Sequence, residues 1–343
     1  MQPSANSTWL RPKRSSVWPS YENEAAEGGA GAPPSPYDEG VESAPEHVRE
    51  LARRRQVARN AHDFALADAL RDEIAASGYA VRDTAAGAVV ERRARFEACS
   101  PESIASVLVE PPTLDVSVHL LYEGFPGDLE RFLDGIARSD LSSAEIVIVD
   151  AASGDGDRIE DLARAHPVAR VCHLDRDPGW AVARNAGLRT SLGGTLVMAD
   201  LSVEPTGEIL EPLRRAVAEQ TVAVAGPFGL VSDDLRSWHS SDGPEVDAVE
   251  GYVMAFRREI AAKGLIRDKF TWYRNADIDF SFQVRSEGLR AVVVPLDVRR
   301  HEHRGWSSLS DEERARRSKR NHYVFFDRWK HHEHLLLARG GGG

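Results

Sequence analysis

The chain has 343 residues, enough for two domains or for one large domain with an appendage. Its 42% apolar and 28% charged residues are typical of globular proteins, and its formal charge of −11 argues against nucleic acid as a partner. The only two cysteines, Cys99 and Cys172, lack the spacing of a zinc site or disulfide framework, which fits a cytoplasmic location. No run approaches the ~20 apolar residues that a transmembrane helix needs, and the N-terminus has no apolar signal core.

Residues 1–43 are rich in Ser, Pro, Gly, Ala and Glu and show no hydrophobic period. Such a segment buries too little apolar surface to offset the entropy of ordering the chain, so we predict a disordered tail. The C-terminal residues 336–343 end in glycines and predict a second, flexible tail.

Residues 44–93 carry a helical pattern followed by a hairpin. Apolar residues recur at helical spacing, Asp63 is placed to cap a second helix, and Gly78 is placed to end it. A short hairpin then fits residues 79–90. The pattern predicts a small helical subdomain.

Several positions in this subdomain match those of a known module. They are Arg53, Ala58, Arg59, Asp63, Phe64, Ala67, Asp68, Leu70, Arg71, Asp72, Gly78, Asp83, Thr84 and Gly87. On these positions, residues 44–93 resemble the C-terminal subdomain of cysteinyl-tRNA synthetases. The synthetase's zinc and nucleotide signatures are absent, so synthetase activity is not implied, and we expect a packing or protein-partner role. RNA binding is the alternative, although acids offset the charge of its basic face.

Residues 94–113 form a polar, proline-containing linker, and residues 114–335 alternate strand and helix patterns. Strands are predicted at 116–121, 146–149, 168–173, 196–199, 222–226, 252–256 and 291–295. Helices are predicted at 127–138, 157–166, 179–191 and 206–219, with a long basic helix at 311–335. This alternation predicts an α/β domain with a mostly parallel sheet flanked by helices.

The run 145–156 is the most informative stretch. Residues 146–149 are all Ile or Val, which predicts a strand buried on both faces, and that strand ends at Asp150. An acid at the carboxyl end of a buried parallel strand faces the crevice where open α/β sheets bind ligands. Asp150 is therefore a candidate for contacting a nucleoside.

The surrounding motifs extend this hypothesis. Tyr122 ends the first strand, the loop reads Asp150-Ala-Ala-Ser-Gly-Asp-Gly, and residues 179–187 read Gly-Trp-Ala-Val-Ala-Arg-Asn-Ala-Gly. These blocks resemble family 2-type glycosyltransferases, which have the GT-A fold. The resemblance implies nucleotide-binding roles for Tyr122, Asp150, Ser153, Asp155, Arg184 and Asn185. For the last two the alternative is structural, with Arg184 paired to a surface acid and Asn185 capping a turn.

Asp200 falls where the family carries an Asp-x-Asp motif, whose carboxylates hold a divalent cation such as Mn²⁺ or Mg²⁺. Ser202 replaces the second acid, and a neutral hydroxyl is a weaker ligand than a carboxylate. The resemblance implies that His301 and His303 are further candidate ligands of this cation. In an extended segment their side chains would point the same way. The alternative is that Asp200 only ends a strand.

Asp277 matches the family's catalytic base, which removes the acceptor hydroxyl proton during inverting transfer. Ala276 replaces the acid that precedes this base in the family. Gly251 and Asp279 lie in segments that resemble the family's acceptor side, and Trp306 is a candidate for stacking on an acceptor sugar. For the segment that begins at Gly251, a plain core strand is the alternative. Capping of a helix by Asp277 and Asp279 is the structural alternative.

We therefore expect a glycosyltransferase that moves a sugar, with inversion, from a nucleotide-diphosphate sugar to a glycan, lipid-linked or small-molecule acceptor. The missing acids at 202 and 276 leave an alternative, an impaired domain that binds nucleotide sugars as a sensor or scaffold. The basic run 314–320 has two interpretations. It is either a solvated helix face, or a surface that attracts an anionic acceptor or a membrane. In the latter case the protein would be peripheral to the membrane.

Overall fold

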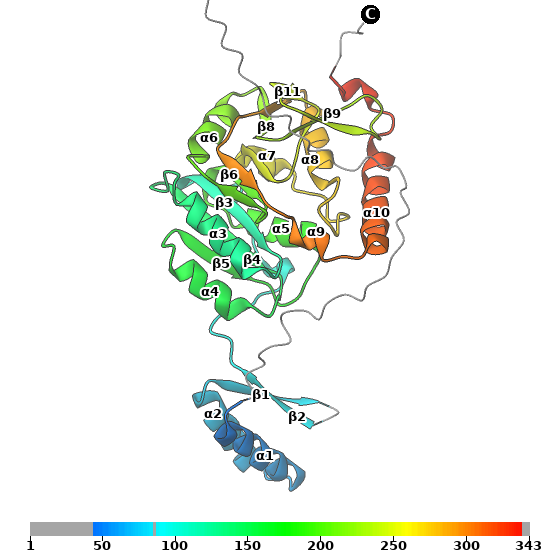
Figure 1. The fold of residues 1–343 in the computed structure, drawn as a ribbon. Coiled ribbons are helices and arrows are strands. Elements are labelled where there is room, and N and C mark those ends of the chain that lie inside the picture. The colour runs from blue at the N-terminus through cyan, green and yellow to red at the C-terminus, as the bar shows by residue number, and fades with distance from the viewer. Residues whose placement is uncertain (1–43, 85–86, 338–343) are drawn as a thin grey trace, which may run out of the picture. The chain divides into compact units, whose positions relative to one another are not determined.

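The computed structural model describes residues 44–84 and 87–337 (Figure 1). The predicted disordered tail at 1–43 lies outside the described residues, as does the predicted flexible tail from residue 338 onward. Within the described ranges, no helix is long and apolar enough to cross a membrane.

The N-terminal subdomain is a helix pair followed by a hairpin, as predicted. Its elements are α1 (Glu46–Asn60), α2 (Phe64–Ala76), β1 (Tyr79–Thr84) and β2 (Gly87–Arg92). Asp63 caps α2, because its carboxylate accepts a hydrogen bond of 3.1 Å from the backbone N–H of Leu66. Arg55 of α1 is buried and forms an ion pair of 2.8 Å with Asp83 of β1, which fastens the helices to the hairpin.

The central sheet has eight strands in the order β11-β14-β8-β13-β6-β3-β4-β5. Their bounds are β3 (Leu114–Tyr122), β4 (Ala144–Asp150), β5 (Ala169–His173), β6 (Gly193–Ala199), β8 (Val222–Gly226), β11 (Glu245–Val246), β13 (Val253–Arg257) and β14 (Arg290–Val293). Strands β6, β3, β4 and β5 are parallel, whereas β13 runs antiparallel between β6 and β8. The predicted, mostly parallel α/β sheet is confirmed.

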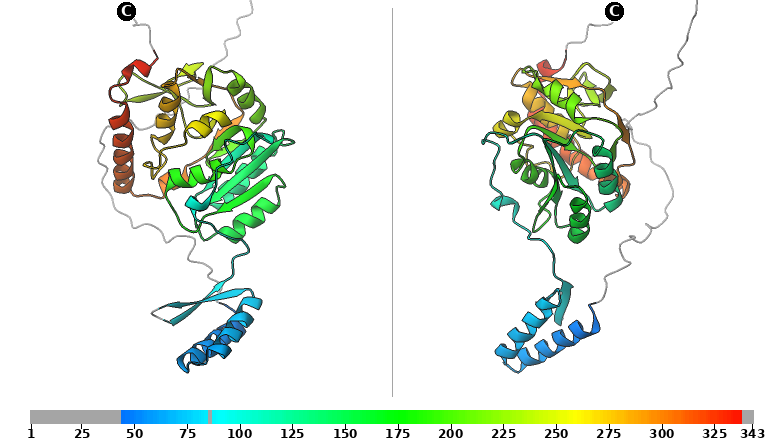
Figure 2. Two further views of the ribbon diagram at one scale, coloured as in Figure 1. Left: turned by 180° about the vertical axis from the view of Figure 1, so that it is seen from behind. Right: turned by 90° about the vertical axis from the view of Figure 1, so that its left-hand side faces the viewer.

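Helices cover both faces of this sheet (Figure 2). One face carries α3 (Pro126–Ile136), α4 (Gly156–Arg164) and α6 (Leu210–Ala218). The other carries α5 (Trp180–Arg189), α7 (Arg258–Lys263) and α8 (Ala276–Arg285). Val197 of β6 enters the first core and Met198 enters the second. Because strands packed on both faces must be apolar at successive positions, the unbroken apolar runs of the sequence mark these strands.

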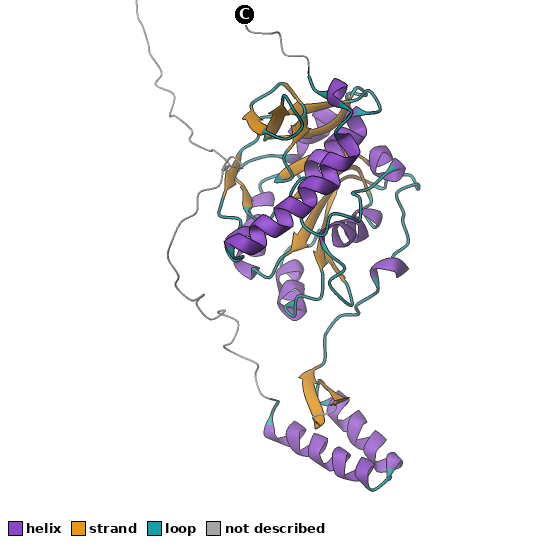
Figure 3. Cartoon of the chain, turned by 90° about the vertical axis from the view of Figure 1, so that its right-hand side faces the viewer, coloured by secondary structure: helices purple, strands orange, loops and turns teal. Residues whose placement is uncertain are grey.

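Short strands and a long helix complete the domain. A three-stranded sheet contains β9 (Gly229–Ser232), β10 (Trp238–Ser241) and β12 (Ala248–Val249), and a two-stranded one pairs β7 (Val203–Pro205) with β15 (Val298–Arg300). Short helical turns are η1 (Pro101–Ser103), α9 (Arg304–Ser307) and η2 (Glu333–Leu335). The predicted C-terminal helix is α10 (Asp311–Trp329), shown in Figure 3. It packs Phe325 and Trp329 against Phe282 of α8.

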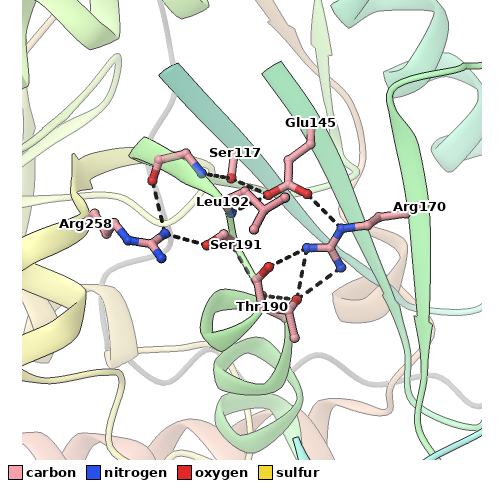
Figure 4. A network of polar contacts seen from close by, with 9 residues as sticks. Ser117, Glu145, Arg170, Thr190, Ser191, Leu192 and Arg258 are labelled. Carbon is pink, nitrogen blue, oxygen red and sulfur yellow. Dashed lines mark hydrogen bonds and ion pairs between the residues drawn. The ribbon is translucent and has the colours of Figure 1, made fainter. Parts of the chain in front are cut away.

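A buried polar network ties the amino ends of the parallel strands together (Figure 4). Glu145 is 5% exposed and accepts hydrogen bonds of 2.6 Å from Ser117 Oγ and from the backbone N–H of Leu192. Its other oxygen accepts a hydrogen bond of 2.7 Å from Arg170 Nε. Because Asp150 lies at the opposite end of the same strand, this network supports the sheet rather than the site described next.

Candidate active site

Three side chains with metal-ligating atoms meet at the carboxyl edge of the sheet. Glu123 follows β3, Asp200 follows β6, and His303 lies between β15 and α9. Their ligand atoms all lie within 4.8 Å of one another, and His303 Nε2 lies 3.2 Å from Asp200 Oδ2. Since β3 and β6 are parallel neighbours, the acids that follow them come together at this edge.

Asp200 and His303 form a buried, charged pair. Burial opposes ionisation of Asp200, but the charge of His303 and hydrogen bonds from Ser202 outweigh it and hold the pKa of Asp200 well below its ordinary value. Burial also opposes charging of the imidazole, yet Asp200 and Glu123 outweigh it and raise the pKa of His303 to about 9. His303 is therefore protonated at neutral pH in this arrangement.

Glu123 lacks a compensating positive charge, and the ring nitrogens of His303 lack well-formed hydrogen bonds. Burial and the nearby charge of Asp200 raise the pKa of Glu123 to about 7. The His303 side chain is only 10% exposed, yet neither ring nitrogen makes a hydrogen bond of normal geometry to the described residues. Two carboxylates and an imidazole are a suitable donor set for Mn²⁺ or a similar divalent cation. The cluster therefore fits the predicted cation.

The structure separates the two histidines predicted as cation ligands. The backbone N–H of His301 donates to the Ser202 carbonyl at 2.7 Å, and its ring Nε2 lies 2.8 Å from Glu204 Oε2. The extended segment ends there and turns into α9, so the expected alternation between His301 and His303 does not hold. Glu123 was not predicted as a ligand. The available signal was an acid directly after the first strand of the domain.

The loop after β4 is ordered by its own side chains. Asp150 is 2% exposed, accepts a hydrogen bond of 2.9 Å from the Ser153 N–H, and lies 2.8 Å from His173 Nδ1. Burial opposes its ionisation, but these hydrogen bonds outweigh it and hold the pKa of Asp150 below its ordinary value. Tyr122 donates to Asp155 Oδ2 at 2.5 Å and so joins β3 to the loop.

The segment predicted as a linker contributes a ring to this loop. Phe96 stacks on His173 with ring centroids 3.5 Å apart and an interplanar angle of 17°. It also covers Gly156, where an added Cβ would lie 2.2 Å from the phenyl ring. His173 in turn lies 3.2 Å from Glu160, so its imidazole is enclosed by two carboxylates and a ring. Nothing in the sequence motif indicated Phe96 or His173.

Arg184 and Asn185 lie behind the cluster. Arg184 is 3% exposed and donates to the carbonyl oxygens of His119 at 3.2 Å and Ala199 at 3.0 Å. Burial lowers the pKa of Arg184, while the negative charges of Asp200 and Glu123 oppose that shift. The positive charge of the guanidinium therefore offsets part of the negative charge of the acidic cluster. The Asn185 amide donates to the Ile266 carbonyl at 2.6 Å. Their side chains thus hold α5 in place.

Asp277 and Asp279 have different surroundings, although both lie in the first turn of α8. Asp277 Oδ2 accepts a hydrogen bond of 2.8 Å from the Gly251 N–H, and burial raises its pKa. Asp279 is 2% exposed and accepts hydrogen bonds from Arg267 at 2.9 Å and Trp329 Nε1 at 2.8 Å. Asp279 therefore anchors α10 in the interior and does not line the acceptor side.

A short stretch of backbone connects Asp277 with the cation cluster, and aromatic rings pack beside His303. Gly251 contacts Asp277, and the carbonyl of the next residue, Tyr252, accepts a hydrogen bond of 2.9 Å from the Asp200 N–H. Tyr273 stacks on His303 with centroids 4.5 Å apart. Beyond it, Trp306 stacks on Trp272 at 5.5 Å and 8°. The acids at 200 and 277 therefore border one region of the structure.

Family models match two parts of the chain. Residues 122–280 match the model described as Glycosyl transferase family 2, and residues 42–90 match the Cysteinyl-tRNA ligase anticodon binding domain. The resemblance to family 2 glycosyltransferases is confirmed. No curated protein matches the sequence.

Two solved glycosyltransferase structures share the fold of the matched domain. A mannosyltransferase from Pyrobaculum calidifontis in complex with GDP-Man and Mn²⁺ aligns with a TM-score of 0.50 and 21% identity, over 68% of this chain and 71% of that one. GalNAc-T7 with UDP, GalNAc and Mn²⁺ aligns with a TM-score of 0.54 and 16% identity over 64% of this chain. The alignment spans 50% of GalNAc-T7. At these identities the likeness establishes the GT-A fold alone.

The segment matched by the family 2 model includes most of the acidic residues of the candidate site. Glu123, Asp150, Asp200 and Asp277 all lie within it, whereas His303 lies C-terminal to it. The third member of the cluster therefore comes from a segment that the family model does not cover.

Proposed function

We propose that this protein is a nucleotide-sugar glycosyltransferase that transfers a sugar to an acceptor hydroxyl with inversion. One observation carries the proposal: Glu123, Asp200 and His303 converge at the sheet edge, and Asp277 is joined to that edge through Gly251. A cation site beside a carboxylate base provides the two functions that such a transfer needs.

The cation would be Mn²⁺ or Mg²⁺, held by Glu123, Asp200 and His303. When bound, it supplies positive charge that stabilises the leaving nucleoside diphosphate. Glu123 provides the second carboxylate that Ser202 does not. Ser202 instead donates to Asp200 Oδ1 from both its backbone N–H and its hydroxyl, which orients that ligand.

Asp277 would act as the general base for the acceptor hydroxyl. Burial raises its pKa toward the range in which a carboxylate accepts a proton efficiently, and two backbone N–H groups fix its position. Gly251 lets the Asp277 side chain approach closely, because an added Cβ there would lie 3.3 Å from the Asp277 Cβ. Trp306 would offer an aromatic ring to a sugar face. Inversion follows if the acceptor attacks the face opposite the diphosphate.

The nucleoside would bind at the loop after β4. Tyr122, Ser153 and Asp155 are the residues we propose to contact it, with Asp150 holding the loop from beneath. Arg184 and Asn185 would act indirectly, by fixing α5 and balancing the charge of the cluster.

The N-terminal subdomain would bind a protein partner. Val57, Phe64 and Leu66 are 64%, 59% and 44% exposed, which is unusual for large apolar side chains and favours a protein contact. Filter binding with tRNA at two salt concentrations distinguishes this proposal from RNA binding. Salt-sensitive tRNA affinity of the full chain would favour the RNA role.

The test of the proposed function is donor turnover. Purified protein is incubated with UDP-, GDP- and dTDP-sugars and Mn²⁺, and released nucleoside diphosphate is measured with and without candidate acceptors. We expect turnover with one donor class and its loss in Asp200→Asn. Binding without turnover for every donor and acceptor would instead support the sensor or scaffold.

A further inference from the structure

Residues 95–99 of the segment predicted as a linker are docked on the domain at both ends. The Arg95 guanidinium donates to Asp161 Oδ2 of α4 at 3.0 Å. At the other end, the Cys99 N–H donates to the His173 carbonyl at 3.0 Å, in an isolated parallel bridge at the end of β5. This short stretch is therefore fixed to both α4 and β5.

Phe96 lies between these two anchors and covers the start of α4. Its ring is half-buried and stacks on the imidazole of His173, with centroids 3.5 Å apart. A Cβ added to Gly156 would lie 2.2 Å from the Phe96 ring, so the ring occupies the space that a side chain there would need. Gly156 directly follows Asp155, one of the residues proposed to contact the nucleoside. The docked segment therefore packs against the nucleoside loop, residues 150–156.

His173 connects the Phe96 ring to the first acid of this loop. The imidazole is 4% exposed, with Nδ1 2.8 Å from Asp150 Oδ2 and Nε2 3.2 Å from Glu160 Oε1. The other Asp150 oxygen accepts a hydrogen bond of 2.9 Å from the Ser153 N–H. Contacts thus run without a break from the Phe96 ring, through an imidazole and a carboxylate, to the backbone of the nucleoside loop.

The stacked ring limits how the His173 imidazole can move. Because Phe96 covers one face and both nitrogens lie near carboxylates, the imidazole has one favourable orientation, in which it holds Asp150 in place. Without the ring, water would reach this face and compete for the same polar groups. The nucleoside loop would then hold its binding conformation in only a fraction of the molecules. Apparent affinity for a nucleoside falls in proportion to that fraction.

We propose that Phe96 is a positioning residue for the donor nucleoside, acting through His173 and Asp150 on the nucleoside loop. The proposal rests on the proposed function and adds to the site a part of the chain that lies N-terminal to the residues matched by the family 2 model. The cation cluster is held by different contacts, since Asp200 is oriented by Ser202. Loss of the Phe96 ring should therefore weaken nucleotide binding and leave cation binding unchanged.

The experiment measures nucleotide and cation binding separately in the full chain. UDP, GDP and dTDP are titrated into native protein by calorimetry with Mn²⁺ present, and the nucleotide that binds is used for the variants. For Phe96→Ala we expect its dissociation constant to rise about 3- to 10-fold, the range expected for the loss of one aromatic pair. In donor hydrolysis, the KM of the corresponding nucleotide sugar should rise by a similar factor with kcat little changed. The affinity for Mn²⁺ alone should match that of the native protein.

A double-mutant cycle with Gly156 separates this role from a general loss of structure. Gly156→Ala should displace the ring and weaken nucleotide binding, whereas adding it to Phe96→Ala should cause little further loss, because the clash is gone. Phe96→Leu keeps an apolar cover and should restore part of the affinity. Phe64→Ala, the same change at a ring that is 59% exposed, is the control and should bind nucleotide as the native protein does.

Equal or tighter nucleotide binding in Phe96→Ala would overturn the role of Phe96. A parallel loss of Mn²⁺ affinity would overturn it as well, because the effect would then not be confined to the nucleoside loop. If Phe96→Ala does not fold, Phe96→Leu and Arg95→Gln carry the same test, since Arg95 is exposed and its loss releases one anchor. Native affinity in both would overturn the proposal. Failure of the native protein to bind any of the three nucleotides would instead overturn the proposed function.

Discussion

Asp277 accepts a hydrogen bond of 2.8 Å from the backbone N–H of Gly251, and this contact ties the proposed base to the strand edge that carries Asp200. The next residue, Tyr252, accepts a backbone hydrogen bond of 2.9 Å from Asp200. One short stretch of backbone therefore sets the position of the base relative to the cation cluster. Such preorganisation matters because small displacements of a catalytic group reduce the rate strongly.

Asp277→Asn should abolish transfer while leaving nucleotide binding nearly intact. The amide has the same size and can still accept the hydrogen bond from Gly251, but it cannot take the acceptor proton. We expect transfer to fall by about 10²- to 10⁴-fold. Initial rates and a nucleotide titration measure the two effects, with Asp242→Asn at an exposed position as the control. Full activity in Asp277→Asn would remove Asp277 as the base.

The transfer rate should fall on the acid side at a pH above that expected for an exposed aspartate, whose ordinary pKa is about 4. Burial raises the pKa of Asp277, against hydrogen bonds from the Gly251 and Ile278 N–H groups and the charge of Arg274. A base must be ionised, so activity is lost as the pH drops through this raised pKa. Arg274→Gln removes an opposing charge and should move the acid limb to still higher pH. A limb that moves to lower pH would contradict this assignment.

Glu123→Gln should weaken cation binding. The variant keeps the side-chain shape but removes one of the two carboxylates that face His303. We expect the Mn²⁺ concentration for half-maximal donor hydrolysis to rise at least ~10-fold, a loss seen even for groups that only support a ligand. Titration calorimetry with Mn²⁺ alone provides a readout independent of turnover. Glu302→Gln, one residue before His303 and exposed, is the matched control, and equal Mn²⁺ affinity in both variants would exclude Glu123 as a ligand.

Glu145→Gln should destabilise the domain without changing its chemistry. Glu145 accepts hydrogen bonds from Ser117, Leu192 and Arg170, and an amide cannot accept all of them because it presents one oxygen. We expect a loss of roughly 2–3 kcal/mol in the free energy of unfolding, measured by urea denaturation. Glu211→Gln on the exposed face of α6 should change stability little. Donor hydrolysis per folded molecule should be unchanged, since the network lies at the far end of the strands.

Much of the fold was predictable from local patterns. The apolar run 146–149 marked β4, and the capping position of Asp63 marked the start of α2. The C-terminal helix was predicted to residue 335 but ends at Trp329, where the chain turns before η2. The short strands β9, β10 and β12 were not predicted, because pairs of two to four residues depend on their partners rather than on an intrinsic pattern.

The amino-acid sequence by itself determined that acids follow several buried strands, and for parallel strands this places Asp150 and Asp200 at one edge of the sheet. Only the tertiary structure decided which side chains meet there: His303 and Glu123 approach Asp200, His301 pairs with Glu204, and Asp279 turns to the interior. The physical reason is that strand order follows from repeating apolar patterns, whereas the direction of a side chain in a loop depends on contacts with residues distant in the chain.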